Sequence, residues 1–100
     1  KTIDQHAYNL MENVIDKSAF VDESLRIDGY LQVGKNSKIG KNVYIKGNVI
    51  VGDNTIIESS KLDRASVGSN CVVGPYTFVT KNTYIKDNSS LSSLREINNN

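Results

Sequence analysis

The chain of 100 residues carries one histidine, His6, and one cysteine, Cys71, so these two side chains are the first candidates for chemistry. An imidazole can act as a general base and a thiolate as a nucleophile. His6 lies in an N-terminal segment outside the repeat described below, where a solvated helix residue is the simpler interpretation. Cys71 falls on a small inward position of the repeat and is interpreted as a core residue. We therefore predict no catalytic residue, and the lone reduced cysteine fits a cytoplasmic protein.

Carboxylates are the next candidates, because paired acids can serve as general acid and base. Five of the eleven acids occupy the outward position directly after an aliphatic residue of the repeat described below: Asp16, Asp22, Asp28, Glu58 and Asp63. Solvated strand charges explain this spacing better than an acid/base pair does. A single histidine also argues against a zinc centre built from histidines. The sequence predicts no metal site.

Two glycine-containing segments resemble the start of a phosphate-binding loop: GDNT at 52–55 and GSNC at 68–71. A phosphate-binding loop of that type ends in lysine, and both segments lack one. They also recur with the repeat, so we interpret them as corners of the chain. No cofactor is predicted, and no residue is singled out as cofactor-binding.

The strongest feature is a ladder of aliphatic residues spaced six apart, with two steps of five between Ile57 and Val67. Residues six apart in a helix scatter around its surface, whereas short strands joined by sharp corners can use this period. The ladder consists of Ile15, Val21, Ile27, Val33, Ile39, Ile45, Val51, Ile57, Leu62, Val67, Val73, Val79, Ile85 and Leu91. We expect these fourteen rungs to form the core, where each contributes about 1.5–3 kcal/mol before entropy is subtracted.

The other hexad positions agree with a coil of three flat sides. Gly follows the rung at 34, 40, 52, 68 and 74, and Asn lies three places after it at 36, 42, 48, 54, 70, 82 and 88. Both residues tolerate positive φ and suit corners. Four places after the rung come compact residues that should face inward: Ala19, Ser37, Val43, Val49, Thr55, Cys71, Thr77, Thr83 and Ser89. The predicted fold class is all-β, a parallel β-helix of about four coils.

We expect three segments along the chain. Residues 1–14 form a short amphipathic helix over the open end of the coil, or the last helix of a preceding domain. Residues 15–90 form the β-helix. Residues 91–100 form a short helical cap and a polar tail, because Ser93 and Glu96 have capping-box spacing and Leu91, Leu94 and Ile97 line one side of a turn. The chain begins without an initiator Met, which favours a fragment of a longer protein.

Charge and hydropathy exclude some partners. The formal net charge is +1, with basic and acidic residues interspersed, so no nucleic-acid or membrane surface is expected. No apolar run is long enough to span a membrane, and no signal peptide is present.

The hexapeptide with its aliphatic rung, Gly and Asn resembles the left-handed parallel β-helix family, and the handedness comes from this resemblance alone. The segments 47–52, 55–59 and 67–79, the last with Val73-Gly74-Pro75-Tyr76, look like the C-terminal domain of sugar-1-phosphate nucleotidylyltransferases. The bifunctional N-acetylglucosamine-1-phosphate uridylyltransferases and their archaeal-type relatives are the nearest analogues. The resemblance implies an upstream nucleotidyltransferase domain, a transferase parent and a parallel trimer.

Departures from that family limit the function. Phe78 and Thr80 stand where the bifunctional enzymes have phosphate-holding arginines. Acyltransferases of this fold use a histidine on a coil, and the carbonic anhydrases of this fold use three, whereas His6 is alone and outside the coils. We therefore predict a β-helix domain that serves assembly or regulation without a complete active site. The alternatives are a sugar acyltransferase with a site between subunits and a non-enzymatic scaffold.

Large apolar residues at the outward position before the rungs point to self-association. These residues are Phe20, Tyr44, Ile50, Ile56, Val72, Phe78 and Tyr84. Ile56 and Val72 should lie on successive coils of one side, with Tyr44 and Phe78 together on another. Scattered surface exposure is the alternative. We expect a homo-oligomer, with the trimer implied by the resemblance.

Overall fold

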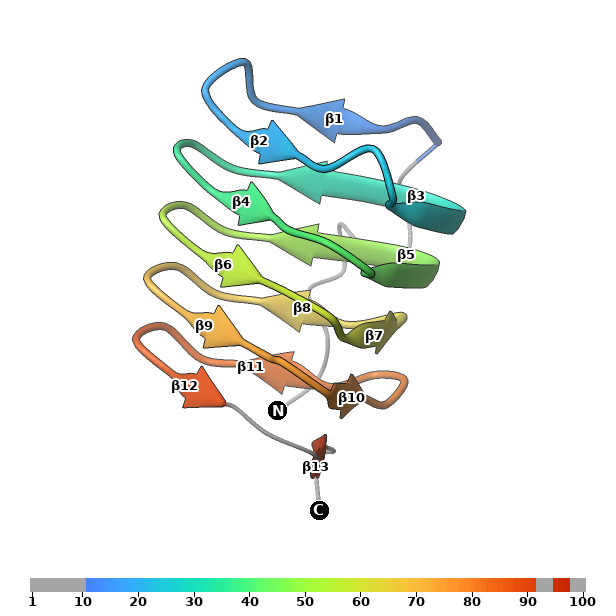
Figure 1. Ribbon diagram of the computed structural model, residues 1–100, viewed down its shortest axis with the longest axis vertical. Coiled ribbons are helices and arrows are strands. Elements are labelled where there is room, and N and C mark those ends of the chain that lie inside the picture. The colour runs from blue at the N-terminus through green and yellow to red at the C-terminus, as the bar shows by residue number, and fades with distance from the viewer. Residues whose placement is uncertain (1–10, 92–94, 98–100) are drawn as a thin grey trace.

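The chain folds as a stack of short parallel strands (Figure 1). The structure is a computed structural model that describes residues 11–91 and 95–97. Over that part it is an all-β parallel β-solenoid of about four turns, with no helix. The strands are β1 (Val14–Ile15), β2 (Phe20–Val21), β3 (Arg26–Val33), β4 (Lys38–Ile39), β5 (Tyr44–Val51), β6 (Ile56–Ile57), β7 (Lys61–Asp63), β8 (Ser66–Val67), β9 (Val72–Val73), β10 (Thr77–Val79), β11 (Tyr84–Ile85), β12 (Ser90–Leu91) and β13 (Arg95–Ile97).

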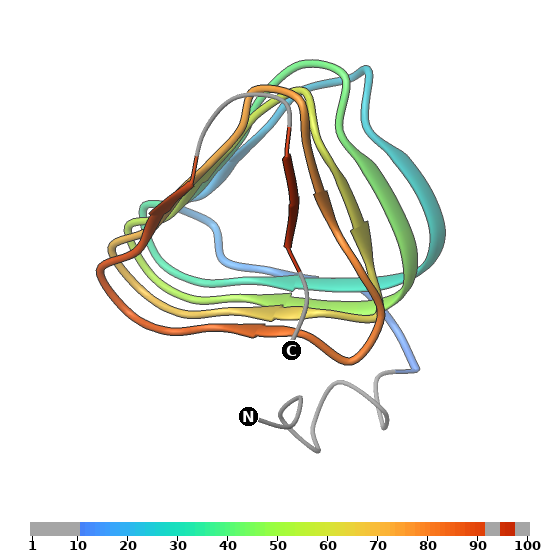
Figure 2. The ribbon, with the colours of Figure 1, turned by 90° about the horizontal axis from the view of Figure 1, so that it is seen from below.

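Three flat faces give the coil the triangular outline seen along its axis in Figure 2. The β6 face is the five-stranded sheet β12-β9-β6-β4-β2. The β7 face holds the first halves of β3 and β5 with β7, β10 and β13, and the β8 face holds β1, the second halves of β3 and β5, β8 and β11. Because β3 and β5 bend around a corner, these last two faces share one sheet.

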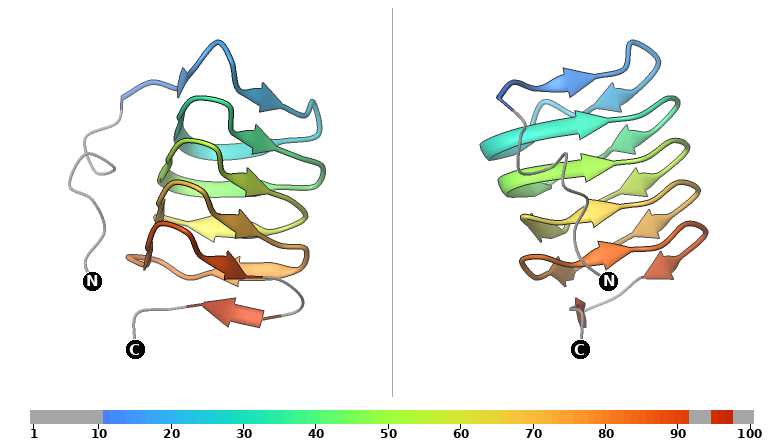
Figure 3. Two further views of the ribbon diagram at one scale, coloured as in Figure 1. Left: turned by 90° about the vertical axis from the view of Figure 1, so that its left-hand side faces the viewer. Right: turned by 180° about the vertical axis from the view of Figure 1, so that it is seen from behind.

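The offset between neighbouring coils follows from the hexad lengths. Three six-residue steps place residues 18 apart on adjacent coils, as where the Lys35 N–H donates to Asp53 Oδ1 at 2.8 Å. The two five-residue steps reduce the offset to 16, so that Ile56 lies opposite Val72. The two short steps therefore shorten one coil without interrupting the stack. Figure 3 shows in two further views that the strands of successive coils remain stacked.

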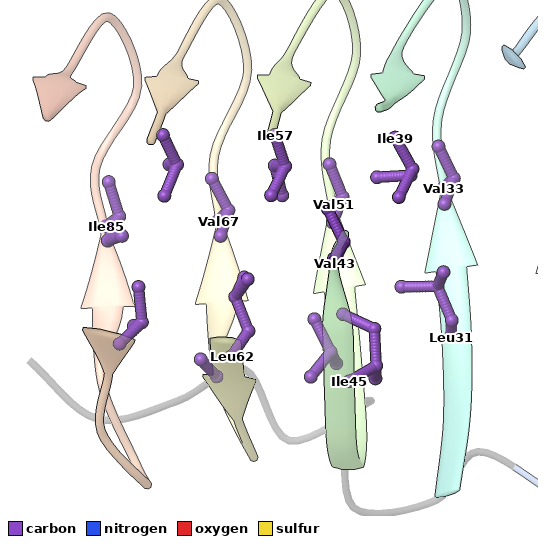
Figure 4. Packing of buried hydrophobic residues seen from close by; sticks show 14 of the residues in the cluster. Leu31, Val33, Ile39, Val43, Ile45, Val51, Ile57, Leu62, Val67 and Ile85 are labelled. Carbon is purple, nitrogen blue, oxygen red and sulfur yellow. The ribbon is translucent and has the colours of Figure 1, made fainter. Parts of the chain in front are cut away.

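The interior is a column of rungs, as predicted. Ile45, Ile57 and Leu62 are fully buried (Figure 4). Burial decreases towards the ends: Ile15 is 39% exposed, and Val21, Ile27 and Leu91 are half-buried. The terminal coils have a neighbouring coil on one side only. Their rungs therefore keep the inward position of the repeat but are less buried than the rungs of the middle coils. Leu31, a large inward residue that the list of compact positions omits, is also fully buried.

Asparagines make the corners by adopting the left-handed conformation. Positive φ is found at Asn36, Asn42, Asn54, Asn70, Asn82 and Asn88. Asn48 is the exception, because Gly47 before it takes the positive φ, at 68°. At the two short steps Ser59 and Arg64 take this role, with φ of 45° and 47°.

Glycines after the rungs serve a different purpose from the one predicted. Of the five, only Gly74 has positive φ, so the expectation that they supply left-handed corners is wrong for the other four. They are needed for space: a Cβ on Gly52 would lie 2.8 Å from the carbonyl carbon of Gly68 on the next coil. The coils stack so closely at this corner that no side chain fits between the two backbones.

Compact inward residues join successive coils through their side chains. Ser37 Oγ donates to the Gly52 carbonyl at 2.6 Å and accepts from the Thr55 N–H at 3.0 Å. Thr55 Oγ1 in turn donates to the Gly68 carbonyl at 2.7 Å and accepts from the Cys71 N–H at 3.2 Å. Each hydroxyl thus satisfies backbone groups that the sheet ladder leaves free at the corner.

We predict that Thr55→Val lowers the free energy of unfolding by about 1–3 kcal/mol, because it leaves a buried carbonyl and a buried N–H without partners. Chemical denaturation measures the change. Thr83→Val is the matched control, since among the described residues the Thr83 hydroxyl hydrogen-bonds only with Thr80 Oγ1, at 3.3 Å, and Thr80 keeps its bond to the Ile97 carbonyl. Equal losses in the two variants would contradict a bridging role for Thr55.

The ends of the coil differ from expectation where they can be compared. Residues 1–10 of the predicted N-terminal helix lie outside the described residues, whereas residues 11–13 are not helical and Val14 is in strand β1, so the prediction is wrong for residues 11–14. The predicted C-terminal helical turn is wrong for Arg95–Ile97, which form β13 and pair with β10. The free edge of β10 accepts one more strand, and Ile97 lies six residues after Leu91, as the next rung would.

Candidate interaction surface

Of the histidine and the cysteine first considered for chemistry, one lies in the described part of the chain. Cys71 is buried, and its Sγ donates to the Lys86 carbonyl at 3.2 Å, which confirms it as a core residue. His6 lies outside the described residues. Residues 11–91 and 95–97 contain no group of three His, Cys, Asp or Glu side chains that could hold a metal ion.

Two of the outward acids organise the first corners. Asp22 Oδ2 accepts from the Ser24 hydroxyl at 2.6 Å and from the Ser24 N–H at 3.0 Å, and these bonds, helped by Lys41 and Lys38, lower the pKa of Asp22. Asp16 repeats the pattern with Ser18, which lowers its pKa as well. These exposed carboxylates act in turns.

Asp63 departs from the prediction of a solvated charge. It is only 8% exposed, and Arg64 Nε donates to its Oδ1 at 2.8 Å. The five-residue step tightens this corner, and the Arg64 side chain lies over Gly47 of the preceding coil, where an added Cβ would be 3.0 Å from Arg64 Cδ. The tight corner and the Arg64 side chain account for the burial of Asp63.

The segment of residues 73–76, on which the family resemblance rests, leads into a corner of the coil, and strand β10 follows it. Tyr76 takes a left-handed conformation with φ of 59° and is 65% exposed. Phe78 and Thr80 then flank the buried rung Val79, and Phe78 stacks against Lys61. No arginine is placed at these positions to hold a phosphate.

The outward apolar residues line up across the coils as predicted. On the β6 face Ile56 lies opposite Val72, and Lys38 lies between Phe20 and Ile56 in register. Phe20, Ile56 and Val72 are 54%, 38% and 41% exposed. A column of exposed apolar side chains, interrupted by one lysine, therefore runs over β2, β4, β6 and β9. Figure 1 shows these four strands stacked above one another.

On the β7 face aromatic and cationic residues alternate. Tyr44 and Phe78 share this face, as predicted, with Lys61 between them in register. Arg26 Cζ lies 4.7 Å from the Tyr44 ring centre, and Lys61 Nζ lies 5.4 Å from Tyr44 and 5.0 Å from Phe78. Such cation–π contacts cover the rings. Our sequence reasoning missed these cations and Lys38, although they hold the same hexad position as the apolar residues.

On the β8 face the outward residue Ile50 lies in register with Gln32 and Ser66. Ile50 is only 9% exposed and Ser66 only 4%. The expectation that Ile50 is an uncovered outward residue is therefore wrong: its register is outward, but its side chain is already covered. The exposed apolar column is a property of the β6 face.

The fold is therefore a hexapeptide-repeat β-solenoid. Its β6 face carries a column of exposed apolar side chains: Phe20, Ile56 and Val72. The model of the GMPPB C-terminal domain family matches residues 10–99, so this chain belongs to that family. It is the C-terminal β-helix domain of a GMPPB-like sugar nucleotidylyltransferase, a type related to GDP-mannose pyrophosphorylase. Comparison with curated proteins gives no match. Within the described residues no helix is long and apolar enough to cross a membrane.

Proposed function

We propose that this domain is the assembly module of a GMPPB-like nucleotidylyltransferase: it holds copies of the enzyme together and leaves nucleotidyl transfer to an upstream domain. The observation that carries the proposal is the exposed column of Phe20, Ile56 and Val72 on the flat β6 face. Apolar side chains aligned over successive coils lose contact with water together when a second surface covers them. Regulation would act through the same contact between copies.

The polar groups on the described coils support a non-catalytic role. The outward acids Asp16 and Asp22 are held by their own turns, and Asp63 is paired with Arg64. Cys71 is enclosed in the core. A general base and a phosphate cradle would therefore have to come from another domain or another subunit.

The test measures mass and activity on the same purified chain. We expect sedimentation to report more than one copy at high concentration, with the trimer implied by the family resemblance as one arrangement. We expect no acetyl transfer to amino or hydroxy sugars, and no pyrophosphate release from a nucleoside triphosphate and a sugar phosphate.

Two results would contradict this proposal. A chain that stays monomeric at the highest attainable concentration would reject the assembly role. Acetyl transfer by the purified chain, abolished by a substitution within a coil, would establish the acyltransferase alternative.

A further inference from the structure

We infer that two copies of this chain pair antiparallel through their β6 faces, with Lys38 of each copy opposite Ile56 and beside Glu58 of the other. This inference rests on the proposed assembly role and specifies its surface, its partner and its symmetry. The twofold axis would lie in the plane of the contact, parallel to the strands and midway between β4 and β6. Such a contact is isologous, because the same patch serves both partners.

The order of residues along the exposed column makes the patch complementary to itself. From coil to coil the column reads Phe20, Lys38, Ile56, Val72. Placed antiparallel about an axis between its second and third members, the column brings Phe20 opposite Val72 at both ends. The two exposed apolar residues cover each other there, and the aliphatic stem of Lys38 lies against Ile56 in the middle.

The charges beside the column follow the same symmetry. A groove of about 230 Å³ on this face is lined by Phe20, Asp22, Lys38, Gly40, Lys41 and Glu58. It thus presents two ammonium groups and two carboxylates. Glu58 follows Ile56 by two residues on the same outward side, so a lysine placed over Ile56 reaches it. Among the described residues none of these four charged groups forms an ion pair within its own copy.

The other two faces lack this combination. On the β7 face Tyr44 and Phe78 are half-buried, with Arg26 and Lys61 against their rings, and the same column continues to Glu96, in register with Phe78. On the β8 face Val14 is exposed, but Ile50 and Ser66 of the same column are covered. Within the described residues, the column of the β6 face holds three exposed apolar residues beside charges of both signs that form no ion pair within the copy, which neither of the other columns does.

The size of the β6 face limits the affinity that we expect for the pairing of two copies. Five strands about 4.8 Å apart make a face roughly 20 Å tall, so the buried patch is smaller than the ~800 Å² per partner of a standard interface. We therefore expect weak, concentration-dependent pairing for this chain, in which the charge contacts decide orientation more than affinity.

The experiment uses charge reversal and mixing, followed by sedimentation of the whole chain. Lys38→Glu alone, or Glu58→Lys alone, places like charges together at both symmetric contacts and should weaken self-pairing roughly tenfold or more. An equimolar mixture of the two variants restores both opposite-charge contacts, so a one-to-one heterodimer should form. The double variant Lys38→Glu, Glu58→Lys should pair with itself again.

Lys46→Glu is the control, because it makes the same charge change at an exposed residue of β5 on the β7 face and should leave the pairing unchanged. Melting curves establish that each variant is folded. Association that persists unchanged in both single variants, as a threefold arrangement through other surfaces would, overturns this inference and leaves the assembly role intact. An unmodified chain that never associates overturns both.

Discussion

Ile45→Asp is expected to abolish the cooperative unfolding transition of this domain. Ile45 is fully buried on the middle coil, between Ile27 and Leu62 in register. Removing the aliphatic side chain and leaving an unpaired carboxylate in its place costs about 5 kcal/mol or more. Small domains have a total stability of about 5–15 kcal/mol, so the loss is comparable with the whole. Circular dichroism during heating and chemical denaturation measures it.

Ile56→Asp is the matched control, because it makes the same change at an isoleucine that is 38% exposed. We expect it to shift the free energy of unfolding by less than about 1 kcal/mol at a concentration where the chain is monomeric. An Ile45→Asp variant that melts within a degree or two of the parent, or a control that unfolds equally, would contradict the inward and outward assignment of the hexad.

The second large effect is expected at a glycine. Gly52→Ala should lower the free energy of unfolding by about 2–3 kcal/mol, because the new Cβ would meet the Gly68 carbonyl carbon at 2.8 Å and Ser69 Oγ at 2.7 Å. Neither backbone can withdraw easily. The Gly52 N–H donates to the Val67 carbonyl at 2.9 Å, and the Gly68 N–H donates to the Ile85 carbonyl at 2.7 Å.

Gly40→Ala tests whether space, rather than the loss of a glycine as such, causes the effect. Gly40 holds the same hexad position, but the atoms nearest to its added Cβ would be those of the Glu58 side chain, with Cγ at 2.6 Å and Cδ at 3.1 Å. That exposed, flexible side chain can move aside. We expect the free energy of unfolding of this variant to change by no more than about 1 kcal/mol. Any cost of moving the Glu58 side chain is offset because alanine lowers the conformational entropy of the unfolded chain. Similar losses in both variants would refute the close-approach explanation.

The candidate surface could be predicted in part. The position before each rung placed Ile56 and Val72 on successive coils of one face and Tyr44 and Phe78 together on another, and both placements are confirmed. The apolar criterion overlooked Lys38, which lies in the same column. The apolar criterion also could not distinguish Ile50, which is only 9% exposed, from Phe20, which is 54% exposed. Exposure depends on what lies across a face, and a hexad position does not contain that information.

At the C-terminal end two sequence patterns predicted different structures. Capping-box spacing predicted a helical turn ending at Ile97, whereas continuing the ladder by six from Leu91 would have predicted a strand. The strand forms because the edge of β10 offers unpaired backbone groups that a single helical turn would leave unused. An isolated turn is costly to nucleate, so the tertiary pairing prevails over the local motif.

The sequence by itself determined the class of fold, the rungs of the core and most of the left-handed asparagine corners. These follow from a period of six and from the backbone freedom of single residues, which are local properties. The tertiary structure alone decided why glycine stands at positions such as 52, why Asp63 is shielded and which outward column stays open to solvent. Each of these depends on how closely one coil approaches the next and on what covers a face, and those distances arise only when the coils stack.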